Sequence, residues 1–119
     1  MTPEEILAQP AKILSQSDRE CYFEHGYVGA PSVVSGTWLE RIQACSERYV
    51  DESRTVSGAD KRFDLEPDHT AEKPRIRRLN SPVDVDDLFW EFASTGPFVD
   101  IAEDLLGSDI KFHHSKLNY

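Results

Sequence analysis

The sequence has little cysteine and no long apolar run. Cys21 and Cys45 are its two cysteines, and no Cys-x-x-Cys occurs, which argues against a disulfide framework or a zinc ribbon. No basic leader precedes an apolar segment, and no window approaches the roughly 20 apolar residues of a membrane helix. We therefore expect a cytoplasmic protein with no membrane partner, in which both cysteines are small, buried or half-buried side chains.

The sequence also lacks an excess of basic residues. Its 119 residues include 22 acidic and 13 basic side chains, which give a formal net charge of -9. Proteins that bind nucleic acids usually present a basic face, so we expect no nucleic-acid partner. The densest basic run contains Lys73, Arg75, Arg77 and Arg78. Such a cluster fits either a site for an anionic small molecule or an ordinary solvated strand.

Apolar residues recur at helical spacing in four segments. A capping box at Ser17 and Glu20 predicts where the first helix begins, and Gly26 is placed to end it. The break at Gly96-Pro97 separates the last two helices. The expected helices cover residues 17–25, 37–50, 84–95 (beginning at Asp84 or Asp86) and 98–106, after a weakly structured lead-in at 1–16.

Four shorter segments have the character of strands, namely residues 27–31, 62–66, 75–79 and 110–119. In the last of these, alternation places His113 and His114 on opposite faces, so the two side chains cannot bind one metal ion together. The face with His114, Lys116 and Asn118 begins apolar and becomes polar, which is typical either of the mouth of a pocket or of a strand that emerges into solvent. Helices followed by strands mixed with helices predict an α+β fold.

Several segments, taken in order, resemble bacterial members of the phytanoyl-CoA dioxygenase family. Residues 22–28 (YFEHGYV) are similar to the opening element of that family, and residues 33–49 are similar to its second helix. The further matches are RIR at 75–77, LFW at 88–90, AEDLLG at 102–107 and FHHSKLN at 112–118. The resemblance covers the chain from about residue 15 onward and implies that residues 1–119 form the N-terminal part of one such domain.

The resemblance implies a double-stranded β-helix, or jelly-roll barrel, flanked by helices, of which this chain holds the N-terminal helices and the first strands. Members of the family use Fe(II), 2-oxoglutarate and O₂ to hydroxylate an unactivated carbon, with iron held by two histidines and one carboxylate. This chain contains no His-x-Asp, and His25, His69, His113 and His114 match none of the ligand positions. We therefore expect no catalytic or metal-binding residue here, and no tight binding of either cofactor by this chain alone.

Two positions are carried over from the family as contacts to 2-oxoglutarate. Lys116 matches the contact residue of the strand that resembles HHSKLN, and Arg75 matches the basic residue that opens the RIR strand. Arg77 lies on the same face as Arg75 by the strand period of two. Fixed cations suit a dianionic ligand, although each of these residues also fits an ordinary charge at the rim of a barrel.

Three functions remain open. The first is the N-terminal part of a dioxygenase for a small-molecule substrate, not competent alone, which predicts a His-x-Asp within a few tens of residues after Tyr119. The second is a non-catalytic binding or interaction module derived from that fold, which predicts a monodisperse protein that unfolds cooperatively at this length. In the third, a separate C-terminal piece or a second copy completes the barrel. The first is favoured because an unfinished barrel exposes apolar strand faces and edges.

Overall fold

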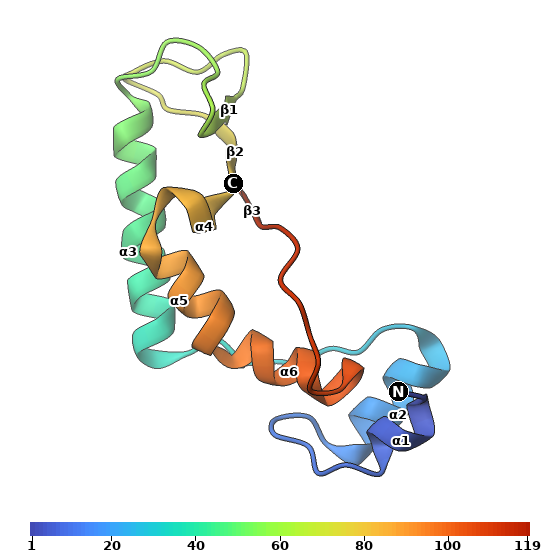
Figure 1. Cartoon of the computed structure of the whole chain (residues 1–119). Helices are drawn as coiled ribbons and strands as arrows, with labels where there is room; N and C mark the ends of the chain where they lie inside the picture. The colour runs from blue at the N-terminus through green and yellow to red at the C-terminus, as the bar shows by residue number, and fades with distance from the viewer. The chain divides into compact units, whose positions relative to one another are not determined.

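The computed structural model describes residues 1–119 and contains six helices and one three-stranded antiparallel sheet (Figure 1). This arrangement confirms the expected α+β class. The chain divides into two compact units. Unit 1 comprises residues 1–35 and 92–112, and unit 2 comprises residues 36–91 and 113–119. No helix combines the length and the apolar composition needed to cross a bilayer.

Unit 1 contains α1 (Pro3–Leu7), α2 (Gln16–His25) and α6 (Pro97–Leu106), which contact one another. A capping box begins each of the first two helices, with Thr2 and Glu5 in α1 and with Ser15 and Asp18 in α2. The prediction that Ser17 caps α2 was wrong, because the Asp18 carboxylate hydrogen-bonds back to the amide and hydroxyl of Ser15. Gly26 ends α2 with φ at 82°, as predicted.

Unit 2 contains one long helix, the sheet and a short helical turn. Figure 1 shows α4 beside α3, and the strand order in the sheet is β1-β2-β3. Helix α5 begins in unit 2, and its residues from Phe92 onward belong to unit 1. The elements are α3 (Gly36–Ser53), β1 (Phe63–Leu65), β2 (Ile76–Asn80), α4 (Pro82–Val85), α5 (Asp87–Thr95) and β3 (Lys116–Asn118).

The core of unit 2 lies between α3, the sheet and the start of α5. Phe63 and Leu79 are fully buried and are partners across β1 and β2, and Leu117 pairs with Leu79 from β3. Successive side chains of a strand point to opposite faces, so one face of the sheet packs on this core and the other is polar. The buried members of the core are Cys45, Tyr49, Phe63, Ile76, Leu79 and Phe89.

Two of the strand predictions were wrong in extent. Residues 27–31 form no strand, since no other segment pairs with them. Of the segment 110–119, residues Lys116–Asn118 alone form a strand. The reason lies in β2, which ends at Asn80, the partner of Lys116. The chain then turns at Ser81 into α4, so no backbone partner remains for residues 110–115.

Candidate functional site

A group of polar side chains covers the face of the sheet that points away from the core. These residues alternate with the buried ones along each strand. Cross-strand pairing places Asn80 beside Lys116 and Arg78 beside Asn118, and side chains of such pairs begin about 5 Å apart. We call this group the polar face. It consists of Asp64, Arg78, Asn80, Lys116 and Asn118.

One carboxylate organises the charges of the polar face. An Oδ atom of Asp64 lies 3.3 Å from Nε of Arg78, and the other accepts a hydrogen bond from Nδ2 of Asn80 at 3.2 Å. Nε of Arg78 is buried and makes no hydrogen bond of good geometry. Lys116 is exposed, and no carboxylate lies within ion-pair distance of it. The face therefore carries two cations against one anion and retains a cation that is available to a ligand.

Arg75 and Arg77 lie toward the other end of β2. Lys116 pairs with Asn80. Arg75 precedes Asn80 by five residues, which corresponds to about 16 Å at roughly 3.3 Å per residue. The backbone positions of the three residues predicted to contact one oxoacid are thus not adjacent. The structure groups Lys116 with Arg78, and it places Arg75 and Arg77 near Glu66.

A β-bulge lies at Arg77, between Ile76 and Arg78. Asp64 pairs with Arg78, but the next residue of β1 pairs with Ile76, so Arg77 is an extra residue on β2. The predicted period of two does not hold across such an insertion, and Arg75 itself precedes the strand. The argument that placed Arg75 and Arg77 on one face therefore does not apply, although both side chains are exposed.

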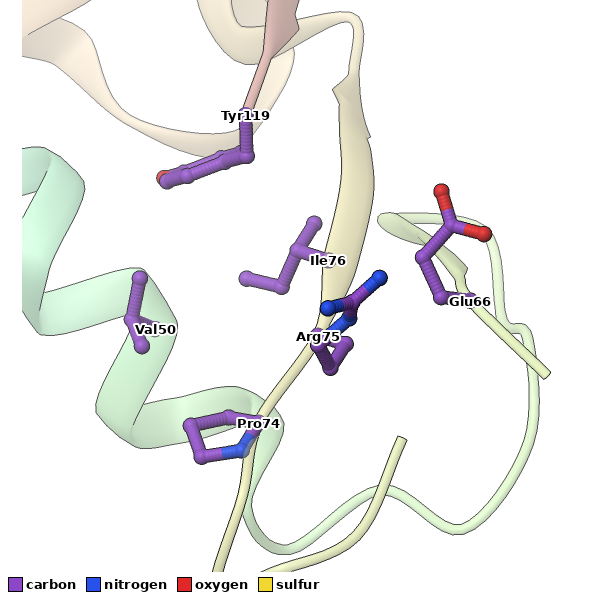
Figure 2. Close-up of a pocket in the computed structure, with 6 residues that line it drawn as sticks. All are labelled: Val50, Glu66, Pro74, Arg75, Ile76 and Tyr119. Carbon is purple, nitrogen blue, oxygen red and sulfur yellow. The ribbon is translucent and has the colours of Figure 1, made fainter. Parts of the chain in front are cut away.

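An open pocket of about 280 Å³ lies at this end of the sheet (Figure 2). Two hydrogen bonds from Arg77, at 3.3 and 3.2 Å, hold the pKa of Glu66 below its ordinary value. Arg75 lies 3.5 Å from the exposed carboxylate of Asp68, a contact that solvent screens. Both ion pairs are exposed to solvent, but Arg77 makes two hydrogen bonds to Glu66, so Arg75 exchanges its partner for a ligand more readily than Arg77 does. The pocket is lined by Val50, Glu66, Pro74, Arg75, Ile76 and Tyr119.

His69 fixes the loop that leads to Arg75. Its Nδ1 accepts a hydrogen bond from the amide of Arg75 at 2.8 Å. Its Nε2 lies 2.9 Å from the carbonyl oxygen of Ser53 and 3.2 Å from that of Val56. The sequence placed His69 in a loop but gave it no role. No group of three or more His, Cys, Asp or Glu side chains is arranged to hold a metal ion.

A second polar cluster surrounds Asp86, which directly precedes α5. Its carboxylate accepts hydrogen bonds from the amide of Leu88 at 2.9 Å and from the hydroxyl of Tyr49 at 3.0 Å, and it also binds Arg48. Burial, followed by the nearby Asp86 carboxylate, raises the pKa of Cys45 to about 11. A thiol with this pKa is not a nucleophile at neutral pH. This cluster is therefore structural, and Cys45 is buried as predicted.

No protein-family model matches the sequence, and no curated protein matches it. The functional assignment therefore rests on the residues and on their geometry. Sequence reasoning proposed Lys116 but did not place Arg78 and Asn80 as its neighbours. The signal was present in the alternation of Arg78, Leu79 and Asn80, but the register that brings them to Lys116 depends on strand pairing.

Proposed function

We propose that this chain is the N-terminal part of an Fe(II)- and 2-oxoglutarate-dependent dioxygenase domain, a cytoplasmic hydroxylase of an unactivated C–H bond in a small molecule. Its iron ligands lie outside these 119 residues. The ordered resemblance to the phytanoyl-CoA dioxygenase family supports the proposal. The α+β fold, with helices on one side of an antiparallel sheet, is compatible with the beginning of a jelly-roll barrel.

The polar face around Lys116 is the observation that carries this proposal. In a closed barrel, alternate residues of each strand line the interior. Leu79 and Leu117 face the helical side of unit 2. The residues that alternate with them along β2 and β3 point the other way and would face the interior of the proposed barrel. Lys116 and Arg78 would supply positive charge there, and Asn80 would supply an amide. These are groups that bind a carboxylate by charge-assisted hydrogen bonds.

Within this proposal, iron and 2-oxoglutarate supply the oxidising chemistry when bound, and this chain binds and orients the oxoacid. Lys116 is the principal contact. Arg75 would offer a separate carboxylate site at the pocket in Figure 2, because about 16 Å of strand lies between it and the position of Lys116 and one oxoacid cannot contact both. Arg77 would support this site by holding Glu66.

The test is to join the chain to the residues that its gene encodes downstream and to measure Fe(II)-dependent conversion of 2-oxoglutarate to succinate. We expect turnover by the joined protein and none by residues 1–119 alone. Loss of one charge-assisted bond costs about 1.5–3 kcal/mol, so Lys116→Ala should raise the KM for 2-oxoglutarate by about tenfold or more. Arg41→Ala is the matched control, because Arg41 pairs with Glu91 on α5 and is absent from the polar face.

A KM that is equal in Lys116→Ala and Arg41→Ala would refute the role of Lys116. A gene that supplies no His-x-Asp downstream would refute the dioxygenase itself. In the second case, the non-catalytic module becomes the better reading, and its expected signature is a monodisperse chain with one cooperative unfolding transition.

A further inference from the structure

One imidazole ring joins three separate parts of unit 2. His69 lies in the loop between β1 and β2 and is bonded to the end of α3 at Ser53 and to the following turn at Val56. Its other nitrogen is bonded to the amide of Arg75, directly before β2. The ring is half-buried. It therefore holds the backbone of Arg75, and with it the rim of the pocket, against the end of α3.

Only one protonation state satisfies all of these contacts. Carbonyl oxygens accept hydrogen bonds, so Nε2 must carry the hydrogen that faces Ser53 and Val56. The amide of Arg75 donates, so Nδ1 must carry no hydrogen. In a protonated ring, an Nδ1 hydrogen would face the amide hydrogen of Arg75 across 2.8 Å. One hydrogen bond would be lost and a repulsion between two donors would replace it.

No neighbouring charge compensates for this loss. No carboxylate lies within ion-pair distance of the His69 ring, since the nearby acidic groups are directed elsewhere. Asp68 lies beside the guanidinium of Arg75, Glu66 binds Arg77, and Asp51 pairs with Arg54. Arg54 in turn donates to the loop at the carbonyl of Ala71, at 2.8 Å. Glu52 pairs with Arg62. The charged groups of the adjoining segments 51–56 and 66–75 are Asp51, Glu52, Arg54, Glu66, Asp68, Glu72, Lys73 and Arg75.

We propose that His69 is a positioning residue for Arg75. The neutral ring fixes the backbone that presents Arg75 to the pocket, and protonation of the ring releases it. Binding of an anionic ligand at Arg75 then weakens on acidification. The identity of that ligand as 2-oxoglutarate rests on the proposed function, but the link between the ring and the Arg75 backbone does not.

The experiment is an NMR titration of the complete 119-residue chain over the interval of about pH 8 to 5, in which histidine side chains change charge. The expected ring ¹⁵N pattern at high pH is a hydrogen on Nε2 and none on Nδ1. On acidification, the hydrogen-exchange protection factor of the Arg75 amide should fall by about tenfold or more, together with protonation of the His69 ring. A tenfold change corresponds to about 1.4 kcal/mol, close to one hydrogen bond. The Leu79 amide is the internal reference for global unfolding.

Two variants separate positioning from a general effect of pH. In His69→Gln the side-chain amide still offers an acceptor and a donor but does not titrate, so protection of Arg75 should no longer depend on pH. In His25→Gln, which removes an exposed histidine of α2, the wild-type dependence should persist.

The proposal is wrong if the wild-type Arg75 amide keeps its protection factor at pH 5, or if His69→Gln retains the wild-type pH dependence. If His69→Gln fails to fold, the protection factor of the Arg75 amide is still compared between the wild-type chain and His25→Gln, and its constancy with pH in both would refute the proposal. None of these measurements requires iron or 2-oxoglutarate. Failure of the Lys116→Ala test therefore leaves this inference standing, and its own failure leaves the proposed function untouched.

Discussion

At the scale of single residues, the polar contacts of unit 1 converge on Asp104. Its buried carboxylate accepts hydrogen bonds from the consecutive amides of residues 12–14 at 2.7, 2.8 and 2.9 Å. Arg19, which is 2% exposed, donates to the carbonyls of Asp104 and Gln9, each at 2.9 Å, and to that of Ile6. Burial raises the pKa of Asp104, but the three amides outweigh it and hold the pKa below its ordinary value.

Asp104→Asn should therefore destabilise unit 1 by about 2–4 kcal/mol, because the new amide places a donor against backbone donors and removes the charge. Denaturant unfolding followed by far-UV circular dichroism measures this loss. Asp100→Asn is the control, since Asp100 on the same helix makes a partly exposed ion pair with Lys12 at 3.3 Å, a type of contact worth at most about 1 kcal/mol. Equal unfolding midpoints for the two variants would contradict the role given to Asp104.

The sign of the Asp104 pKa shift also sets a pH dependence. Because the folded pKa is lowered, the stabilisation is present above the unfolded pKa of about 3.9 and is lost as the pH falls through the folded value. Stability measured against pH in this acid range should thus fall more steeply in the wild-type chain than in Asp104→Asn. Parallel curves for the two proteins would show that this carboxylate is not the group responsible.

Cys45 gives a dependence at the alkaline end. Its folded pKa of about 11 lies above the ordinary value of 9.0, so the unfolded chain releases this proton first. The contribution of Cys45 to the free energy of unfolding is complete below pH 9.0 and is lost as the pH rises through about 11, to a total of roughly 3 kcal/mol. Cys45→Ser keeps a hydrogen-bond donor but does not titrate in this range. Its stability should fall less between these pH values, and an unchanged slope would exclude Cys45 as the cause.

At the scale of elements, the helices and the strands β1 and β2 were largely predictable from the sequence, whereas the predicted strands at 27–31 and 110–115 were wrong. Helix signals are local, and Gly26 and the Gly96-Pro97 pair mark real helix ends because they act on their own backbone. A strand exists only where a partner exists. Residues 110–115 have the composition of a strand. However, β2 ends at Asn80, the partner of Lys116, and α4 follows, so no residue of β2 lies opposite them. The bulge at Arg77 is equally invisible in sequence, since it depends on the residue opposite.

The end of α2 offers a test at this scale. Gly26 has φ at 82°, and a Cβ added there meets no atom within 4 Å, so the cost of a side chain is conformational alone. Gly26→Ala should lower the stability of the chain by about 1–2 kcal/mol. Gly29 has similar free space without the positive φ, so Gly29→Ala should change stability by less than about 0.5 kcal/mol. Thermal unfolding of both variants distinguishes backbone strain at a positive φ from a steric clash of the added Cβ. Equal transition temperatures for the two variants would exclude backbone strain.

At the scale of the whole molecule, the sequence proposed individual cations of the candidate site but not their grouping in space. The resemblance to the dioxygenase family proposed Lys116 and Arg75 as contacts to one oxoacid, and the strand period added Arg77. The pairing register then separated them, placing Lys116 with Arg78 on the polar face and Arg75 beside the pocket. A sequence read without its sheet register cannot distinguish one site with three cations from two sites that share them.

The two units have separate interiors, and this predicts separate unfolding transitions. Unit 1 depends on the buried Asp104, whereas unit 2 depends on an apolar core in which Leu79 is fully buried. Both tryptophans, Trp38 and Trp90, belong to unit 2, so their fluorescence reports that unit, while circular dichroism reports the helices of both. Leu79→Ala should cost about 2–5 kcal/mol and shift the fluorescence transition to lower denaturant.

Asp104→Asn should instead shift the circular dichroism transition and leave the fluorescence midpoint in place, because no tryptophan belongs to unit 1. Coincident shifts of both probes in both variants would mean that the chain unfolds as one cooperative structure. That result would favour the non-catalytic module, which requires cooperative unfolding at this length. Divergent shifts would mean that the two units open independently, which is compatible with the proposed N-terminal part of a dioxygenase domain.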